Sequence, residues 1–445
     1  MSVNSQHDAR EVPVSACAPQ SLEDFETALV QFHSYFGDPV ETMQATLNND
    51  PEFVLGHIFV ASAMLIMGER QYISAIRNSI ERAEALSTKS NDREKMLVHA
   101  ARQWMEGRWD KACETWDRVL TDYPRDAMAL QLAHLTDFFR GDALNLRDRV
   151  GRTLTHWHRD VPGYSYIQGM YAFGLEECNQ HKIAEETGYY ALSIEPRDGW
   201  AVHAIAHVLE MQGRYDEGIT LYTERVNDWA PDNGFAFHNW WHFALYYMER
   251  DDFNGALGLY DSRILPQPCD LSSQLLDASA LLWRLMLQGV DTGSRWDELA
   301  DMWASKTELE NGYYAFNDFH ALIAFVGAER LSAAREILAA VENTAAHSTG
   351  LNAMMSRDVG IPACRAMLAF GEKRYAETVS CLVNLRPIAN RFGGSHAQRD
   401  ILSQTLLDAA IRDGQLALAS NLLSERKCNK PMTPLSKRYE TRIYH

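Results

Sequence analysis

The sequence lacks a long uninterrupted apolar run. Its most apolar stretch, from Val54 to Met67, contains Gly56 and His57 and is shorter than the roughly 20 residues that a membrane-spanning helix needs. The first 20 residues contain neither the basic region nor the apolar core of a secretory signal. We therefore expect a cytoplasmic protein that neither spans nor binds a membrane.

Cysteine is scarce, and its positions show no regular spacing. The seven cysteines include no CxxC pair, which argues against a disulfide framework and against a zinc ribbon. We interpret them as reduced thiols, in agreement with a cytoplasmic location.

Basic residues are outnumbered. Lys and Arg total 42 against 60 Asp and Glu, a formal net charge of −18. Because nucleic acids are bound through a basic surface that neutralises phosphates, this balance argues against a nucleic-acid partner. The first 50 residues carry a net charge of −7, whereas residues 425–445 carry +4. We interpret the basic tail as packing back on an acidic body, with an interaction arm as the alternative.

Signals for β-strands are also scarce, and a turn followed by a helix recurs instead. The clearest copies are Gly107-x-Trp109-x-x-Ala112-x-x-x-Trp116, Gly213-x-Tyr215-x-x-Gly218-x-x-x-Tyr222 and Asp251-x-Phe253-x-x-Ala256-x-x-x-Tyr260. The turns at Gly107 and Gly141, and those at Asn179 and Gly213, are 34 residues apart. This is the tetratricopeptide pattern of paired helices, in which the small residue lets the two helices approach closely.

The repeats predict the fold class and the domains. We expect an all-α solenoid of tetratricopeptide-type helical hairpins, wound into a right-handed superhelix with a concave inner face. Residues 21–425 are predicted to form one continuous repeat domain, although the stretch after about residue 270 fits the pattern poorly. Residues 1–20 form an N-terminal extension that is a candidate for disorder, and residues 426–445 form the basic C-terminal tail.

Two successive inner helices each carry a pair of histidines four residues apart. Over residues 199–211, one stripe is apolar and suits the core, whereas the other contains Trp200, His203, His207 and Glu210. In the next such helix, the corresponding stripe contains His238, Trp241, His242, Leu245 and Glu249. In tetratricopeptide repeats, this face of the first helix of each repeat lines the concave surface. We therefore predict a pocket lined by histidine and carboxylate groups.

The histidine pairs suggest two kinds of chemistry. Imidazoles at i and i+4 of one helix can bind one metal ion such as zinc, although neither pair contains the Glu of an HExxH site. Without a metal, histidine can act as a general acid or base near neutral pH. The structural alternative is a set of hydrogen-bonded histidines with no ligand.

Two further stretches contribute candidate site residues. Residues 316–320 (FNDFH) are expected to open another inner helix, and residues 393–400 (GGSHAQRD) are expected to form a turn before a helix. In that turn Ser395 would cap the helix, and backbone N–H groups would receive an anion.

Candidate roles follow from these positions. The candidate catalytic residues are His203, His207, Glu210, His238, His242 and His320. The candidate substrate-binding residues are Trp200, Asn239, Trp241, Asp318, Arg399 and Asp400. The candidate ligands of a divalent metal such as zinc, if one is bound, are His203, His207, His238 and His242.

Long and unusual stretches of this sequence resemble the tetratricopeptide repeat protein 38 family. They are WAVHAIAHVLEMQGRYDEG (200–218), HNWWHFALYYME (238–249), LWRLMLQGV (282–290), FNDFH (316–320), RDVGIPAC (357–364) and GGSHAQRD (393–400). The resemblance covers residues 160–445 and, more loosely, the N-terminal third. It implies an all-helical solenoid, and the family pattern covers the candidate site residues other than Trp200 and Trp241, but it implies no activity.

Two function classes remain open. The first is a repeat protein whose pocket binds a small molecule or a short peptide. The inner residues are not the Lys, Arg and Asn that clamp a peptide carboxylate. The second is a small-molecule hydrolase or lyase that uses the inner histidines in acid–base or metal-assisted reactions. An adaptor should have an open groove, whereas an enzyme should enclose its histidines. The sequence predicts no oligomeric state.

Overall fold

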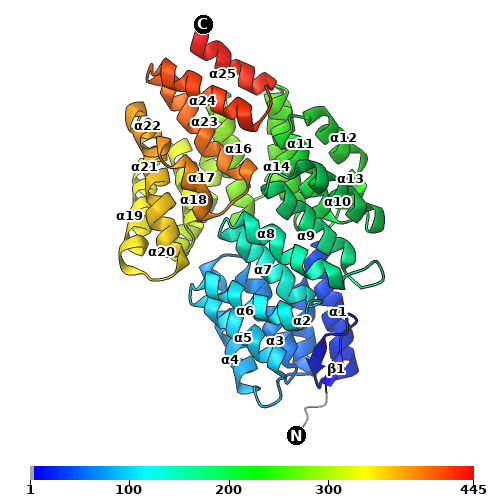
Figure 1. Cartoon of the computed structure of the whole chain (residues 1–445). Coiled ribbons are helices and arrows are strands. Elements are labelled where there is room, and N and C mark those ends of the chain that lie inside the picture. The colour runs from blue at the N-terminus through cyan, green and yellow to red at the C-terminus, as the bar shows by residue number, and fades with distance from the viewer. Residues whose placement is uncertain (1–4) are drawn as a thin grey trace. The chain divides into compact units, whose positions relative to one another are not determined.

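The computed structural model describes residues 5–445, which are almost entirely helical (Figure 1). Their contacts divide the chain into two compact units. Unit 1 extends to Ile205 and also contains Asn227–Phe235, and unit 2 comprises Ala206–Val226 and Ala236–His445. The first boundary lies inside one unbroken helix, α11 (Gly199–Met211).

Unit 1 consists of helices and one pair of short strands. The strands are β1 (Ser5–His7) and β2 (Pro13–Ser15). The helices are α1 (Pro19–Ser34), α2 (Pro39–Asn49), α3 (Val54–Leu65), α4 (Ile73–Ala85), α5 (Asp92–Met105), α6 (Trp109–Asp122), α7 (Ala127–Phe139), α8 (Ala143–Thr153), α9 (Tyr164–Glu177) and α10 (His181–Ile194). Short 3-10 turns precede α4 and follow α8: η1 (Arg70–Tyr72) and η2 (Leu154–His156).

Unit 2 continues the same helical pattern. Its helices are α12 (Tyr215–Glu224), α14 (Ala236–Glu249), α15 (Phe253–Leu259), α16 (Ser272–Leu287), α17 (Arg295–Glu310), α18 (Ala315–Gly327), α19 (Leu331–His347), α20 (Leu351–Met355), α21 (Ile361–Gly371), α22 (Tyr375–Val383), α23 (His396–Arg412), α24 (Leu416–Asn429) and α25 (Pro434–Tyr444). It also contains the π-helical turns η3 (Tyr260–Ile264) and η4 (Ser356–Gly360) and the 3-10 helix η5 (Arg386–Phe392). The short helix α13 (Val226–Trp229) lies at a boundary between the units.

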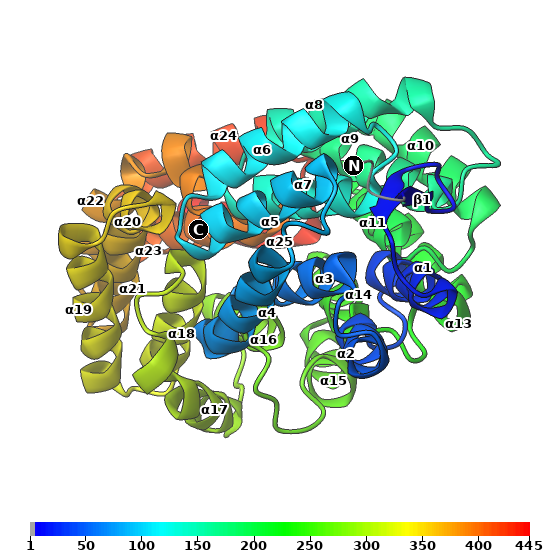
Figure 2. The same cartoon turned by 90° about the horizontal axis from the view of Figure 1, so that it is seen from below.

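Successive helices pack as hairpins in both units. In unit 1, α5 packs on α6 and α9 packs on α10. In unit 2, α18 packs on α19 and α21 packs on α22, as Figure 2 shows. Helical pairs continue beyond residue 270, where the sequence pattern is weak. The structure thus confirms the all-α, tetratricopeptide-type repeat fold, whereas the single domain of residues 21–425 and its superhelix stay predictions.

The predicted turns are built by residues with a left-handed backbone. Gly107 has a φ of 80° and Gly213 has a φ of 67°, and Asp251 occupies the same region with a φ of 69°. A left-handed residue just past a helix end lets the chain reverse direction, which glycine does at the least cost. The aromatic residue two positions later is the first residue of the next helix, as Trp109 is in α6.

The small residue of each repeat has the expected packing role. Ala112 and Ala256 are fully buried. At Gly218 a Cβ atom would lie 2.2 Å from the ring of Tyr246. This glycine is therefore required for the close approach of α12 and α14.

The N-terminal extension contains structure that the sequence did not predict. Strands β1 and β2 pair antiparallel, with Gln6 opposite Val14. The Asp8 carboxylate accepts hydrogen bonds from the backbone N–H groups of Arg10 (2.8 Å) and Val12 (2.9 Å) and so holds the turn between the strands. The described part of the extension, residues 5–20, is thus partly ordered as a β-hairpin instead of being disordered.

The basic C-terminal tail packs on unit 2, as its charge led us to expect. Helix α24 continues without a break through Arg426, whose guanidinium pairs with Asp400. In α25, Arg438 pairs with Asp251 at 3.1 Å. The tail is therefore an integral part of unit 2.

The remaining predictions about membranes and disulfides have simple outcomes. No helix in residues 5–445 is long and apolar enough to cross a membrane. The seven cysteines, all within the described residues, form no disulfide bond.

Candidate metal centre

Helices α11 and α14 carry the predicted histidine pairs. The Asp198 carboxylate caps α11 by accepting hydrogen bonds from the backbone N–H groups of Trp200 (3.1 Å) and Ala201 (3.0 Å). One helical turn separates His203 from His207 on α11, and one turn separates His238 from His242 on α14. The Tyr246 hydroxyl of α14 donates a hydrogen bond of 2.6 Å to the Ala206 carbonyl of α11 and so fixes the two helices to each other.

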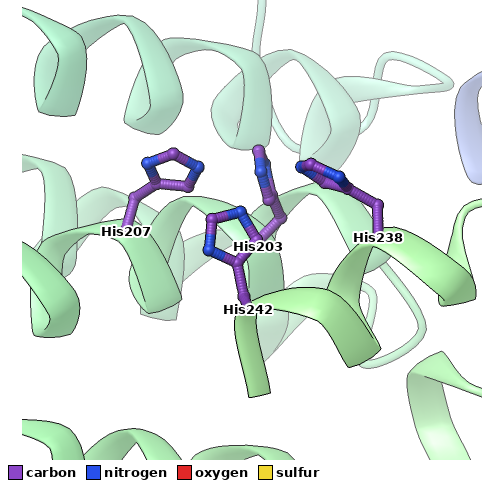
Figure 3. A group of neighbouring side chains, drawn as sticks. All are labelled: His203, His207, His238 and His242. Carbon is purple, nitrogen blue, oxygen red and sulfur yellow. The ribbon is translucent and has the colours of Figure 1, made fainter. Parts of the chain in front are cut away.

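The four imidazoles lie together (Figure 3). One ring nitrogen from each of His203, His207, His238 and His242 can be chosen so that all lie within 4.8 Å of one another. The residues are only 0–8% exposed. A tetrahedral zinc ion with Zn–N bonds of 2.0–2.1 Å holds its ligand atoms about 3.4 Å apart. Small side-chain adjustments would therefore bring the nitrogens to bonding distance.

Two of the imidazoles are oriented by buried carboxylates. His238 Nδ1 lies 2.7 Å from Asp277 Oδ2, and His242 Nδ1 lies 3.4 Å from Glu210 Oε2. If Nδ1–H donates to a carboxylate, the Nε2 lone pair is left for a ligand. This carboxylate–histidine arrangement is the usual outer shell of histidines that bind metals.

Burial keeps the histidines in the form that binds metals. It lowers the pKa of His207 to about 3 and the pKa of His242 well below its ordinary value. Burial raises the pKa of Asp277, and the nearby His238 opposes that rise. Neutral imidazoles are metal ligands, whereas protonated imidazoles are not.

A network of charged side chains surrounds the imidazoles in unit 2. We define the charge network as Glu210, Glu249, Asp277, Asp400, Arg284, Arg426 and Lys430. Lys430 Nζ lies 2.8 Å from Glu249 Oε1 and 3.3 Å from Glu210 Oε1. Burial lowers the pKa of His207, and Arg399 also lies close enough to lower it. The carboxylates around these imidazoles are therefore matched by cationic groups.

Trp241 joins the imidazoles to the charge network. The ring is fully buried, stacks on His238 with a centroid distance of 5.4 Å and meets His242 edge-on at 4.8 Å. The Arg284 guanidinium lies 5.3 Å from the Trp241 centroid and donates a hydrogen bond of 2.7 Å to the Ala397 carbonyl. Burial lowers the pKa of Arg284.

Other predicted site residues have structural contacts. Asn239 accepts a hydrogen bond from the Tyr222 hydroxyl at 3.1 Å, and Asp318 accepts one from the Gly312 N–H at 2.9 Å. His320 Nδ1 donates to the Phe316 carbonyl at 2.8 Å. His320 is not part of the four-histidine group.

The predicted site residues of α23, and Trp200 of α11, also make contacts within the protein. Arg399 donates to the Gly394 carbonyl of its own helix start. Asp400 pairs with Arg426, and Trp200 packs against His203 with a centroid distance of 5.0 Å. Ser395 caps α23 as predicted, by accepting a hydrogen bond from the Gln398 N–H.

The face of α11 that was expected to line a concave surface is buried. His207 and the core residue Ile205 both have no exposed surface, and Glu210 is 5% exposed. Both stripes of this helix are therefore covered, and the histidines do not line an open groove.

Sequence reasoning missed Asp277 and Lys430. Asp277 is the single acidic residue of the mostly apolar helix α16, and Lys430 lies in the C-terminal tail, 220 residues from Glu210 in the sequence. A single acidic residue in an apolar helix is a signal for a buried partner, but neither residue belongs to a local motif.

Comparison with known proteins gives similarity of fold only. No protein-family model matches the chain. It is similar to a chain of the Cut9–Hcn1 hetero-tetramer of the APC/C, with 12% identity and a TM-score of 0.42 over 88% of this chain and 63% of that chain. This chain thus spans less than two thirds of that protein.

Two other solved structures are similar over most of their length. The human IFIT1 dimer with m7Gppp-AAAA has 12% identity and a TM-score of 0.43, over 96% of this chain and 95% of that chain. The P58(IPK) TPR domain has 13% identity and a TM-score of 0.22, over 89% and 98%.

Proposed function

We propose that this protein binds one divalent transition-metal ion, with zinc as the best fit, through the histidines of α11 and α14, and that a small molecule binds at this centre. The observation that carries the proposal is the group of four buried imidazoles whose ligand-capable nitrogens lie within 4.8 Å of one another. Imidazole suits zinc, copper, iron and nickel, whereas calcium and magnesium prefer oxygen ligands.

The outer contacts support a metal site over a set of structural histidines. Asp277 and Glu210 each face the Nδ1 of a different histidine, which prepares the opposite nitrogens as ligands. In this proposal Glu210, which the sequence marked as a candidate catalytic residue, orients His242.

The enclosure of the histidines favours a small ligand over an extended peptide. A peptide groove exposes its contact residues to solvent, whereas His203, His207 and His242 are at most 2% exposed. Four imidazoles would complete the tetrahedral coordination of zinc, whereas a zinc ion held by three of them would have an open position for a carbonyl or phosphoryl group.

A metal-assisted hydrolase is the second candidate function. The specific observation in its favour is the clustering of groups with perturbed pKa values, since burial lowers those of His207 and His242 and raises that of Asp277. Such clusters are characteristic of catalytic sites. Hydrolysis of p-nitrophenyl acetate or p-nitrophenyl phosphate that depends on zinc and is lost in His238→Ala would support this candidate.

Zinc titration of purified full-length protein tests the proposed metal centre. We expect one zinc ion per chain, measured by competition with a chromophoric chelator. His238→Ala and His242→Ala should each weaken the affinity by at least about 100-fold, because loss of a first ligand costs more than the 10–100-fold typical of an outer partner. The exposed His347 of α19 supplies the matched control, His347→Ala, which should bind like the natural protein. Equal affinity in all variants, or no binding by the natural protein, would reject the metal centre.

A further inference from the structure

The C-terminal tail reaches the candidate metal centre through one side chain. Lys430 is the C-cap of α24, and its side chain is 8% exposed. Its ammonium lies between Glu249 of α14 (2.8 Å) and Glu210 of α11 (3.3 Å). Glu210 in turn faces the Nδ1 of His242 at 3.4 Å. An unbroken path of polar contacts therefore runs from the tail to a candidate metal ligand.

The two oxygens of Glu210 divide their contacts. Oε1 faces Lys430, whereas Oε2 faces His242. Lys430 therefore fixes the rotation of the Glu210 carboxylate. That rotation in turn determines which nitrogen of the His242 imidazole carries the proton. Without the shared ammonium group, the two buried carboxylates would repel each other, and this repulsion would turn Glu210 away from the imidazole of His242.

The backbone around Lys430 is held in place by independent contacts. Pro431 packs against the Gly213 turn, since a Cβ atom on Gly213 would lie 3.4 Å from the Pro431 side chain. Thr433 caps α25 through its hydroxyl, which accepts a hydrogen bond from the Ser436 N–H. Gln288 of α16 donates a hydrogen bond of 2.8 Å to the hydroxyl of the buried Tyr439. These contacts present the lysine in one position.

We infer that Lys430 is a positioning residue of the metal centre, which holds Glu210 so that it orients the His242 imidazole. This inference rests on the proposed function. None of the candidate site residues predicted from the sequence lies in the C-terminal tail. The inference therefore gives the tail a role in metal affinity that the sequence did not predict.

The test uses the full-length protein and two substitutions of the same residue. Lys430→Met keeps most of the aliphatic stem but removes the charge, and it should weaken zinc affinity by about 10–100-fold, the range for loss of an outer-shell partner. Lys430→Arg retains the positive charge. On a logarithmic scale, its loss of zinc affinity should therefore be no more than half the loss in Lys430→Met. A general structural effect of Lys430→Met would not be rescued selectively in this way.

The matched control lies in the same tail. Arg438 pairs with Asp251 at 3.1 Å and is 41% exposed, so Arg438→Met should change zinc affinity by no more than about twofold. Zinc affinity of Lys430→Met equal to that of the natural protein would overturn the inference. Equal losses in Lys430→Met, Lys430→Arg and Arg438→Met would overturn it as well, because they would show a general effect of disturbing the tail.

A second measurement separates this inference from the proposed function. Nitrogen-15 NMR of histidine-labelled protein reports which nitrogen of His242 carries the proton. Lys430→Met should reduce the population of the Nδ1–H tautomer, and Arg438→Met should leave it unchanged. If the natural protein binds no zinc, the proposed function fails. The tautomer populations of His242 then decide by themselves whether Lys430 has a positioning role. An unchanged tautomer in Lys430→Met would reject that role.

Discussion

At the scale of single residues, histidine behaves differently according to its partners. His238 and His242 face carboxylates, whereas His134 of α7 lies among aromatic rings, with centroid distances of 6.2 Å to Phe173 and 6.0 Å to Trp200. Burial lowers the pKa of His134 to about 3, and Arg149 adds to this effect. The pairing with carboxylates therefore distinguishes His238 and His242 from a histidine that serves the core.

The low pKa of His134 predicts how stability depends on pH. The folded-state pKa lies below the unfolded value of about 6.5, so the unfolded chain takes up a proton that the folded chain does not. The contribution of neutral His134 is present above pH 6.5 and is lost as the pH falls toward 3. Relative to His134→Phe, the natural protein should lose about 2 kcal/mol of unfolding free energy between pH 7 and pH 5.

Urea denaturation at pH 7 and pH 5 measures this difference. The exposed His99 of α5 provides the control, because His99→Phe should show no such relative change. Parallel losses in the natural protein and His134→Phe would show that His134 titrates alike in the folded and unfolded states.

The sequence predicted which histidines come together, but not which charged residues contact them. The i and i+4 spacing on two neighbouring repeats predicted which four histidines come together, because helical periodicity fixes the face of each side chain. Asp277 and Lys430 were beyond such reasoning. Their pairing with His238 and Glu210 depends on how α16 and the tail pack, which no local pattern encodes.

At the scale of the helix pair, turn chemistry determines the architecture. Left-handed residues such as Gly107 and Asn179 end one helix, and the aromatic or histidine residue two positions later begins the next. This local signal explains why the hairpins were predictable. Glu329 and Gly414 form equivalent turns beyond residue 270, but Leu331 and Leu416 begin the following helices, and leucine is too common to mark a repeat.

The contact between α12 and α14 gives a direct test of the repeat packing. Gly218→Ala places a Cβ atom where the Tyr246 ring lies, 2.2 Å away, and should destabilise the protein by about 1–3 kcal/mol through overpacking. At Gly258 of α15, by contrast, a Cβ atom would have no neighbour within 4 Å. Gly258→Ala should therefore stabilise the helix by about 0.5–1 kcal/mol, because alanine loses less backbone entropy than glycine on folding.

Thermal unfolding of the two alanine variants distinguishes these effects. We expect a lower midpoint for Gly218→Ala and an unchanged or higher midpoint for Gly258→Ala. A Gly218→Ala protein as stable as the natural one would show that α12 and α14 do not require a glycine at their contact.

At the scale of the whole molecule, the charge asymmetry has a structural meaning. The formal charge of −18 gave no direct indication of a cation site, because it counts histidine as neutral and does not locate carboxylates. In unit 2 the basic tail pairs with acidic residues of other helices, as Arg442 does with Asp408. Lys430 alone among the tail's basic residues contacts Glu210, and it connects this general pairing to the candidate metal centre.

The metal centre is tested most directly by a crystal structure of the chain loaded with one equivalent of zinc, with data collected on both sides of the zinc absorption edge. A single strong anomalous peak should lie among the imidazoles of His203, His207, His238 and His242, within bonding distance of a ring nitrogen of at least three of them. Zinc–nitrogen bonds should be about 2.0–2.1 Å long. An anomalous map with no peak there, or with its strongest peak at another site, would show that these histidines do not form a zinc site.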